Sequence, residues 1–310
     1  MKIIYLDQFF VSNLNDLPSK IWIEISEILF RLSKRKKLIC PLSFEHYIES
    51  AKRKIYDAKR NDEILNKLSG GKIYQIDFYI NVEYIKRYIR NEPITNSVYL
   101  ADAVKNKLNE PEAIEKFREI ERNYSKDINT NQEFVNSLRK INQNKFNLNT
   151  SSALFKLTAQ MPSNDFKERM ETLFRNGTIE IRGTKTATGE VPNWIDIILE
   201  YLLRHFEFKP PEMVKLYEEI KTNGFKNLPT LNILSQLRAY QSIMDKGINS
   251  GDEIDNTRIS IGLPASDILF TDKKRKSEII DLKLHKRYNY LTLSGTEKDL
   301  NEFKKELKKM

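Results

Sequence analysis

Two aspartates directly follow short, mainly apolar runs near opposite ends of the chain. Asp7 follows the run IIYL at 3–6, and Asp272 follows the run ILFT at 268–271. Continuous apolar runs of this length are typical of strands that are buried on both faces of a parallel sheet. Such sheets bind ligands beyond the carboxyl ends of their strands, where both aspartates are expected. Carboxylates that converge there suit hard divalent cations, which in turn neutralise charge on a phosphate.

The elements that would position Asp7 follow from hydrophobic periodicity. Residues 2–6 read as a strand, 21–32 as a helix with apolar residues at helical spacing, and 38–40 as a second strand. These three elements form a βαβ unit. After the second strand, an apolar stripe from Phe44 to Ala58 predicts one helix, with Ser43 as its N-cap.

The C-terminal end alternates in the same way around Asp272. Residues 255–261 predict a short helix, 262–264 (GLP) a turn, 268–270 a buried strand, 278–284 a helix, 290–293 a strand, and a terminal helix from about 297. Alternating strands and helices at both ends predict one α/β fold, a parallel sheet flanked by helices.

The middle of the chain has a different pattern. Helical spacing of apolar residues dominates between the two ends, so residues 61–249 are expected to form a mainly helical insertion in a core made of 1–60 and 250–310. An Asn-rich stretch at 142–152 interrupts this pattern, and residues 178–189 are compatible with a small hairpin.

Composition limits the class of protein. The chain has 310 residues and a net charge of +9, which favours nucleic acid or another polyanion as partner. Cys40 is the only cysteine, so neither an intramolecular disulfide nor a zinc centre is expected. The N-terminal apolar run is too short for a signal peptide and no run is long enough to span a membrane, which predicts a cytoplasmic protein.

These segments together resemble the PIN-like nucleases, a family with a Rossmann-like parallel sheet. The resemblance rests on IIYLDQ at 3–8, on CPLS at 40–43 leading to Glu49, and on residues 252–273. It covers about 120 residues at the two ends and leaves the insertion aside. It implies that Asp7, Glu49, Asp255 and Asp272 bind Mg²⁺ or Mn²⁺ and activate a water.

The resemblance leaves several positions open, and the secondary candidates are Glu45, Asp252, Asp267 and Thr271. Glu45 lies one helical turn before Glu49, but the first turn of a helix favours a carboxylate without any metal. Asp252 is expected to be an N-cap, and Asp267 either belongs to the site or caps the turn before its strand. His46 is expected to lie on the helix surface as a solvated or capping residue rather than to take part in catalysis.

The expected activity is endonucleolytic hydrolysis of phosphodiester bonds, most readily in RNA. Basic residues next to the acids are expected to hold the phosphate backbone, namely Lys52, Arg53, Lys273, Lys274 and Arg275. RNA or single-stranded DNA is the expected partner, with a second copy of the chain or a regulatory protein as further candidates. A role as a toxin or immunity effector follows from analogy alone.

Two other classes of function remain open from the sequence. The first is a nucleic-acid-binding protein with a degenerate site, in which the acids do not converge. The second is an interaction module whose helical insertion recruits a partner through an apolar patch.

Overall fold

A computed structural model describes the chain except residues 106, 109, 124–125, 127–147, 187–188 and 245–249. The described residues divide into two compact units. Unit 1 consists of 1–75, 99–122 and 261–310, and unit 2 of 76–98 and 123–260. Both ends of the chain therefore belong to unit 1.

Unit 1 contains a four-stranded parallel sheet with the order β2-β1-β7-β8. Its strands are β1 (Lys2–Tyr5), β2 (Leu38–Ile39), β7 (Ile268–Phe270) and β8 (Leu291–Leu293). β1 pairs with both β2 and β7, so strands from opposite ends of the sequence lie at the centre. The predicted α/β fold with a parallel sheet flanked by helices is confirmed.

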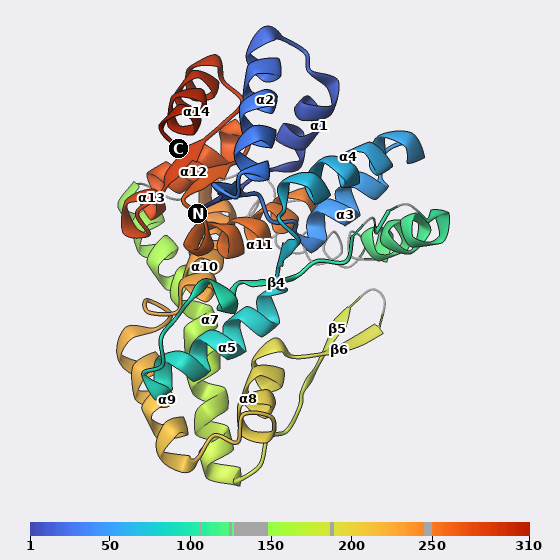
Figure 1. Ribbon diagram of the computed structural model, residues 1–310. Coiled ribbons are helices and arrows are strands. Elements are labelled where there is room, and N and C mark those ends of the chain that lie inside the picture. The colour runs from blue at the N-terminus through green and yellow to red at the C-terminus, as the bar shows by residue number, and fades with distance from the viewer. Residues whose placement is uncertain (106, 109, 124–125, 127–147, 187–188, 245–249) are drawn as a thin grey trace. The chain divides into compact units, whose positions relative to one another are not determined.

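One face of this sheet is covered by α1 (Gln8–Asp16), α2 (Lys20–Lys34) and α14 (Glu297–Lys309). Figure 1 shows α2 in blue beside α14 in red. Phe10 of α1 lies 4.4 Å from Phe270 of β7, and Phe303 of α14 lies 4.7 Å from Phe270, measured between ring centroids. Large apolar side chains from three helices and a strand therefore share one core.

Tyr5 belongs to the opposite face, where α11 (Ser250–Ala265) ends. A Cβ at Gly262 would lie 3.0 Å from Tyr5 Cδ2 and 3.5 Å from Leu269 Cδ1. Gly262 thus permits a close approach of helix to sheet. The predicted turn at 262–264 is wrong, because the helix continues to Ala265, and Pro264 near its end removes only one main-chain hydrogen bond.

The predicted single helix over 44–58 is also wrong. The structure has α3 (Phe44–Ala51) and α4 (Ile55–Leu68) with a break between them. Arg118 donates hydrogen bonds to the carbonyl oxygens of Ala51 (2.7 Å) and Arg53 (3.0 Å). In a continuous helix these carbonyls would accept from residues four positions later, so the Arg118 guanidinium stabilises the break instead. Ser43 is the N-cap of α3, as predicted.

Three further parts of unit 1 were not read correctly from the sequence. α1 was not predicted at all. The helix expected at 278–284 is α12 (Lys273–Asp281), which begins directly after Asp272, followed by the short α13 (Leu284–Arg287). An antiparallel pair, β3 (Lys72–Tyr74) and β4 (Leu100–Asp102), was also missed.

Unit 2 is mainly helical. It contains α5 (Asp77–Arg90), η1 (Asn96–Val98), α7 (Leu148–Asn176), α8 (Trp194–Arg204), α9 (Pro210–Asn223), α10 (Pro229–Met244) and the first part of α11 (Figure 1). Its apolar core comes from α5 and α7 to α10. The expected hairpin lies later than predicted, as β5 (Gly183–Thr186) and β6 (Gly189–Pro192). Of the Asn-rich stretch, 142–147 lies outside the described residues, and α7 begins at Leu148.

Among the described residues, none of the helices combines the length and the apolar character that crossing a bilayer requires.

Candidate functional site

Asp7 and Asp272 occupy equivalent positions on neighbouring strands. β1 leads to β2 on one side of the sheet and β7 leads to β8 on the other, so the connections diverge between β1 and β7. This is the switch point at which open parallel sheets bind ligands beyond the carboxyl ends of their strands. Both aspartates stand at that edge, as the sequence predicted.

Each of these aspartates is also the N-cap of the helix that follows its strand. Asp7 Oδ1 accepts a hydrogen bond from the Gln8 main-chain nitrogen at 2.6 Å, and Asp272 Oδ1 accepts one from the Arg275 nitrogen at 2.9 Å. A carboxylate has two oxygens, so capping by one leaves the group chemically able to bind a cation. Capping alone would also explain an aspartate at each position.

His46 fixes the start of α3 to the carboxyl end of β1. Its ring is fully buried, with Nε2 2.6 Å from the carbonyl oxygen of Leu6 and Nδ1 2.9 Å from the main-chain nitrogen of Ser43. Since the carbonyl only accepts and the main-chain N–H only donates, Nε2 carries the proton and Nδ1 accepts. The expected surface position of His46 is wrong, because the ring is buried, but its capping role at the start of α3 is confirmed. The same ring holds Leu6, the residue that precedes Asp7.

Gln8 forms a second link between these segments. Its Nε2 donates to Ser50 Oγ at 2.8 Å, and both side chains are buried. The bond joins the residue after Asp7 to the residue after Glu49. Gln8 Oε1 is buried and has no hydrogen-bond partner among the described residues. An amide oxygen is a hard ligand, so its chemistry fits a divalent cation beside a carboxylate.

Glu45 and Glu49 are one helical turn apart on α3, and both side chains are half-buried. Glu45 lies in the first turn of the helix, where a negative charge is favoured without a metal. Glu49 lies in the second turn and directly precedes Ser50, which accepts the hydrogen bond from Gln8. The preference for Glu49 as the site residue stays a prediction.

Asp267 lies at the opposite edge of the sheet from Asp272. It immediately precedes β7, and its carboxylate accepts from the main-chain nitrogen of Ile3 (2.9 Å) and from Lys2 Nζ (2.6 Å). β7 has three residues, which at roughly 3.3 Å each separate its two ends by about 10 Å. Asp267 therefore caps the start of the central strands, which was the alternative to a place in the site. Thr271, in contrast, is at the same edge as Asp272, with its side chain buried.

Asp252 and Asp255 lie in the part of α11 that belongs to unit 2. Asp252 is inside the first turn and not an N-cap, because the helix already begins at Ser250. Asp255 Oδ1 is 3.9 Å from Arg258 Nη1 within the same helix. A shared centre of Asp255 with Asp7, Glu49 and Asp272 stays a prediction.

Within the residues that the structure describes, no group of three or more His, Cys, Asp or Glu side chains is arranged to hold a metal ion. Asp7 and Asp272 nonetheless supply the oxygen donors that Mg²⁺ and Mn²⁺ prefer, and both cations commonly complete their shells with water. The donor chemistry of the edge therefore fits the cation that the sequence implied.

The basic residues near the acids differ in exposure. Lys273 and Lys274 are exposed at the start of α12, whereas Arg275 is 1% exposed and its Nη1 donates to Glu278 at 2.5 and 2.7 Å. Arg275 thus stabilises α12 from inside instead of facing solvent. Lys52 is exposed and forms an ion pair with Glu121 at 2.8 Å, and Arg53 is half-buried.

A buried acid near this edge was missed by the sequence reading. Asp299 accepts hydrogen bonds from Lys276 Nζ (2.7 Å) and from the main-chain nitrogen of Ser294 (2.7 Å), the residue that follows β8. Burial alone would raise the pKa of Asp299, but the Lys276 ammonium group and the Ser294 donors outweigh it and hold the pKa below its usual value. Asp299 therefore stabilises the end of β8 as a carboxylate.

The sequence contained local helix-capping signals for the positions of His46 and Asp299. The spacing of Ser43 and His46 matches a capping box, in which the N-cap and the third helical residue bond reciprocally. Thr296 caps α14 by accepting from the nitrogen of Asp299, again three residues later. The Gln8–Ser50 pair has no such local signal, because its partners are 42 residues apart.

Comparisons with protein-family models, with curated proteins and with solved structures found no match.

Proposed function

We propose that the chain is a metal-dependent nuclease of the PIN-like class that hydrolyses phosphodiester bonds in RNA. The observation that carries this proposal is the pair of aspartates, Asp7 and Asp272, at the carboxyl ends of adjacent parallel strands on either side of the switch point. Acids at this place suit binding of a divalent cation close to a phosphate.

Each residue has a distinct role in this proposal. Asp7 and Asp272 hold Mg²⁺ or Mn²⁺, and Glu49 and Asp255 complete the acidic centre. The cation, when bound, acidifies a water and offsets negative charge on the scissile phosphate. His46 and Gln8 act as positioning residues, since their bonds to Leu6 and Ser50 fix the segments that carry Asp7 and Glu49.

Exposed lysines support a polyanionic substrate. Lys273 and Lys274 follow Asp272 directly, and Lys52 follows Glu49 by three residues, so positive charge adjoins the acids in both segments. Such residues bind the phosphate backbone without reading its sequence. RNA is proposed over DNA because the family resemblance points to ribonucleases, and a toxin or immunity role is the corresponding biological setting.

The test compares aspartates at the two edges of the same sheet. Asp7→Asn and Asp272→Asn retain a good N-cap but lose the charge. Cleavage of a mixed RNA panel in Mn²⁺ should fall about 10²–10³-fold, the equivalent of several kcal/mol of charge stabilisation. Asp267→Asn, at the opposite edge, is the matched control and should leave cleavage unchanged. Equal cleavage by wild type and both edge variants would contradict the proposal.

A degenerate RNA-binding protein is the second candidate, because N-capping accounts for Asp7 and Asp272 without a metal. It predicts RNA binding that weakens steeply with salt, no cleavage of any substrate in Mg²⁺ or Mn²⁺, and no calorimetric binding of Mn²⁺ that depends on Asp7. Loss of Mn²⁺ binding in Asp7→Asn would favour the nuclease.

A further inference from the structure

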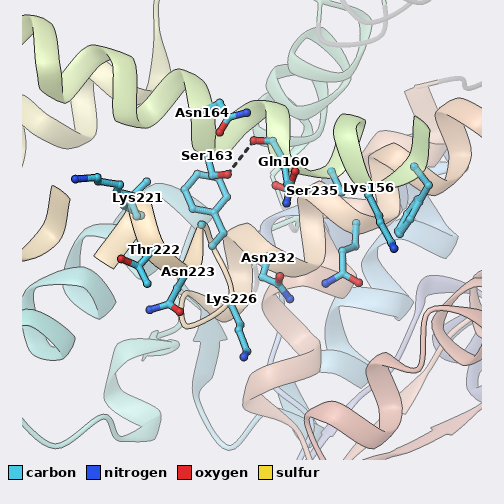
Figure 2. A pocket seen from close by; sticks show the side chains of 16 residues that line it. Lys156, Gln160, Ser163, Asn164, Lys221, Thr222, Asn223, Lys226, Asn232 and Ser235 are labelled. Atoms are coloured by element: carbon cyan, nitrogen blue, oxygen red, sulfur yellow. Dashed lines mark hydrogen bonds between the residues drawn. The ribbon is translucent and has the colours of Figure 1, made fainter. Parts of the chain in front are cut away.

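Unit 2 contains a cavity of about 390 Å³ between α7, the end of α9 with the turn that follows it, and α10. Figure 2 shows its labelled side chains coming from these three segments. The turn residue Gly224 has φ +56°, and a Cβ there would lie 3.2 Å from Ser163 Oγ on α7. A glycine therefore lets the turn close against α7, which forms one wall. This space is called the lysine cavity below.

The lining of the lysine cavity is rich in hydrogen-bond donors and positive charge. It includes Lys156, Lys221 and Lys226, together with asparagine, glutamine, serine and threonine side chains, and among the described residues no aspartate or glutamate lines it. Lys221 does approach Glu218, at 3.4 Å, but both side chains are largely exposed, so this pair is weak. Such a lining favours an anion, and above all a phosphate, over a cation or an apolar ligand.

A second cavity of about 310 Å³ adjoins the first, because Phe225 and Ser235 line both. Its walls carry the aromatic rings of Phe78, Trp194 and Phe225, and this space is called the aromatic cavity. The ring of Trp194 lies 6.4 Å from that of Phe225 in an edge-to-face arrangement, and its side chain is 40% exposed. A planar ring that enters this cavity can therefore stack on exposed aromatic surface.

Two charged groups lie in the aromatic cavity. Asp77 Oδ1 accepts from the main-chain nitrogen of Phe78 at 2.8 Å, and Arg238 Nε donates to Glu253 at 2.9 Å. Burial raises the pKa of Asp77, against the lowering effects of the Phe78 hydrogen bond and of Arg238. A carboxyl group among aromatic rings offers acceptors to an exocyclic amino group of a heterocyclic base.

We propose that the two adjoining cavities of unit 2 form a nucleotide-binding site, with the base in the aromatic cavity and the phosphate in the lysine cavity. Each cavity has a volume in the range of small-molecule sites, roughly 300–1,000 Å³, and together they match the two chemical halves of a nucleotide. The nucleotide is either free or part of an RNA strand. The site lies wholly in unit 2 and does not depend on hydrolysis at Asp7 and Asp272.

The first experiment uses intrinsic fluorescence of the full chain in chelator, which prevents metal-dependent cleavage. The chain has two tryptophans, Trp22 and Trp194, and Trp22 is buried in unit 1. AMP, CMP, GMP, UMP, inorganic phosphate and an RNA hexanucleotide are titrated separately. Nucleotide should quench the emission of wild type but not of Trp194→Phe, which retains an aromatic ring and should still bind by calorimetry.

The second experiment measures affinity by calorimetry in variants of each cavity. Trp194→Ala should weaken nucleotide binding roughly tenfold or more through loss of stacking. The double variant Lys156→Ala/Lys221→Ala should weaken it by about tenfold per lysine and reduce its salt dependence. Lys167→Ala is the matched control on α7, outside the lining, and should bind as wild type. UMP should bind more weakly than AMP, because uracil has no amino group for Asp77.

The outcomes separate the two sources of the nucleotide. Binding of mononucleotides that is weakened by Trp194→Ala and by the double lysine variant supports a site for a free nucleotide. Binding of the hexanucleotide alone, weakened by the same variants, supports a strand-binding site. If inorganic phosphate binds as tightly as AMP, the base contributes nothing to affinity, and the assignment of the base to the aromatic cavity is overturned. Failure of every probe, or binding unaffected by Trp194→Ala and by the double lysine variant, would overturn the proposal. Equal affinity for UMP and AMP would remove the role assigned to Asp77.

Discussion

Replacing His46 by phenylalanine tests whether this residue holds the candidate site together. The phenyl ring is a planar aromatic ring like the imidazole, but it is one ring atom larger and has no nitrogen. The carbonyl oxygen of Leu6 and the N–H of Ser43 would then lose their partners at 2.6 and 2.9 Å in a fully buried position. Each unsatisfied buried group costs about 1–3 kcal/mol. We therefore expect the free energy of unfolding to fall by about 2–6 kcal/mol.

The assay is urea unfolding, followed by tryptophan fluorescence and far-UV circular dichroism. The midpoint should fall while the slope m stays constant, because the unfolded chain is unchanged. His285→Phe is the control, since His285 is only half-buried and its Nδ1 has no hydrogen-bond partner among the described residues. It should change the free energy of unfolding by less than about 0.5 kcal/mol. A His46→Phe protein as stable as wild type would refute the reasoning.

Two other predictions concern the same unit. Gly262→Ala should destabilise the protein by about 1–2 kcal/mol in thermal unfolding, because the new Cβ would meet the ring of Tyr5, which is packed against His46 and Tyr74. This loss should exceed the gain from the better helix propensity of alanine, and a stabilised variant would contradict the prediction. Asp299 has a lowered pKa, so its contribution should be present above the unfolded pKa of about 3.9 and be lost as the pH falls through the folded value. In urea unfolding between pH 3 and 7, Asp299→Asn should therefore differ most from wild type near pH 7, and a pH-independent difference would exclude this role.

The parallel sheet could be predicted because its strands are short, continuous apolar runs with an acid at the carboxyl end. Residues 3–6 and 268–270 have this pattern, and both central strands formed there. The helix α1 was missed because only Asp7 and Gln8 separate its apolar residues from the strand run, so the change from strand to helix periodicity is hard to detect. Asp7 was the available signal, since it caps that helix.

The errors elsewhere came from contacts that are distant in sequence. The break between α3 and α4 depends on Arg118, which donates a hydrogen bond to the carbonyl oxygen of Arg53. The two residues are 65 positions apart in the sequence. At Gly262 and Pro264 the local signals for a turn were overridden, because a glycine there lets α11 pack closely on Tyr5. Asp267 was left open between a place in the site and a cap before its strand, and strand geometry could have decided between them. An acid that precedes a strand of three residues must lie at the opposite edge from one that follows it.

The caps at Asp7 and Asp272 have an electrostatic consequence for the sheet edge. Helices α1, α3, α12 and α14 all begin just beyond the carboxyl ends of the four parallel strands. The N-terminus of a helix carries a partial positive charge of about half a unit, which arises from its aligned peptide dipoles. This backbone field offsets repulsion between the carboxylates before a cation arrives. Because it comes from the main chain, it persists when the acids are neutralised and would then favour anions at the same edge.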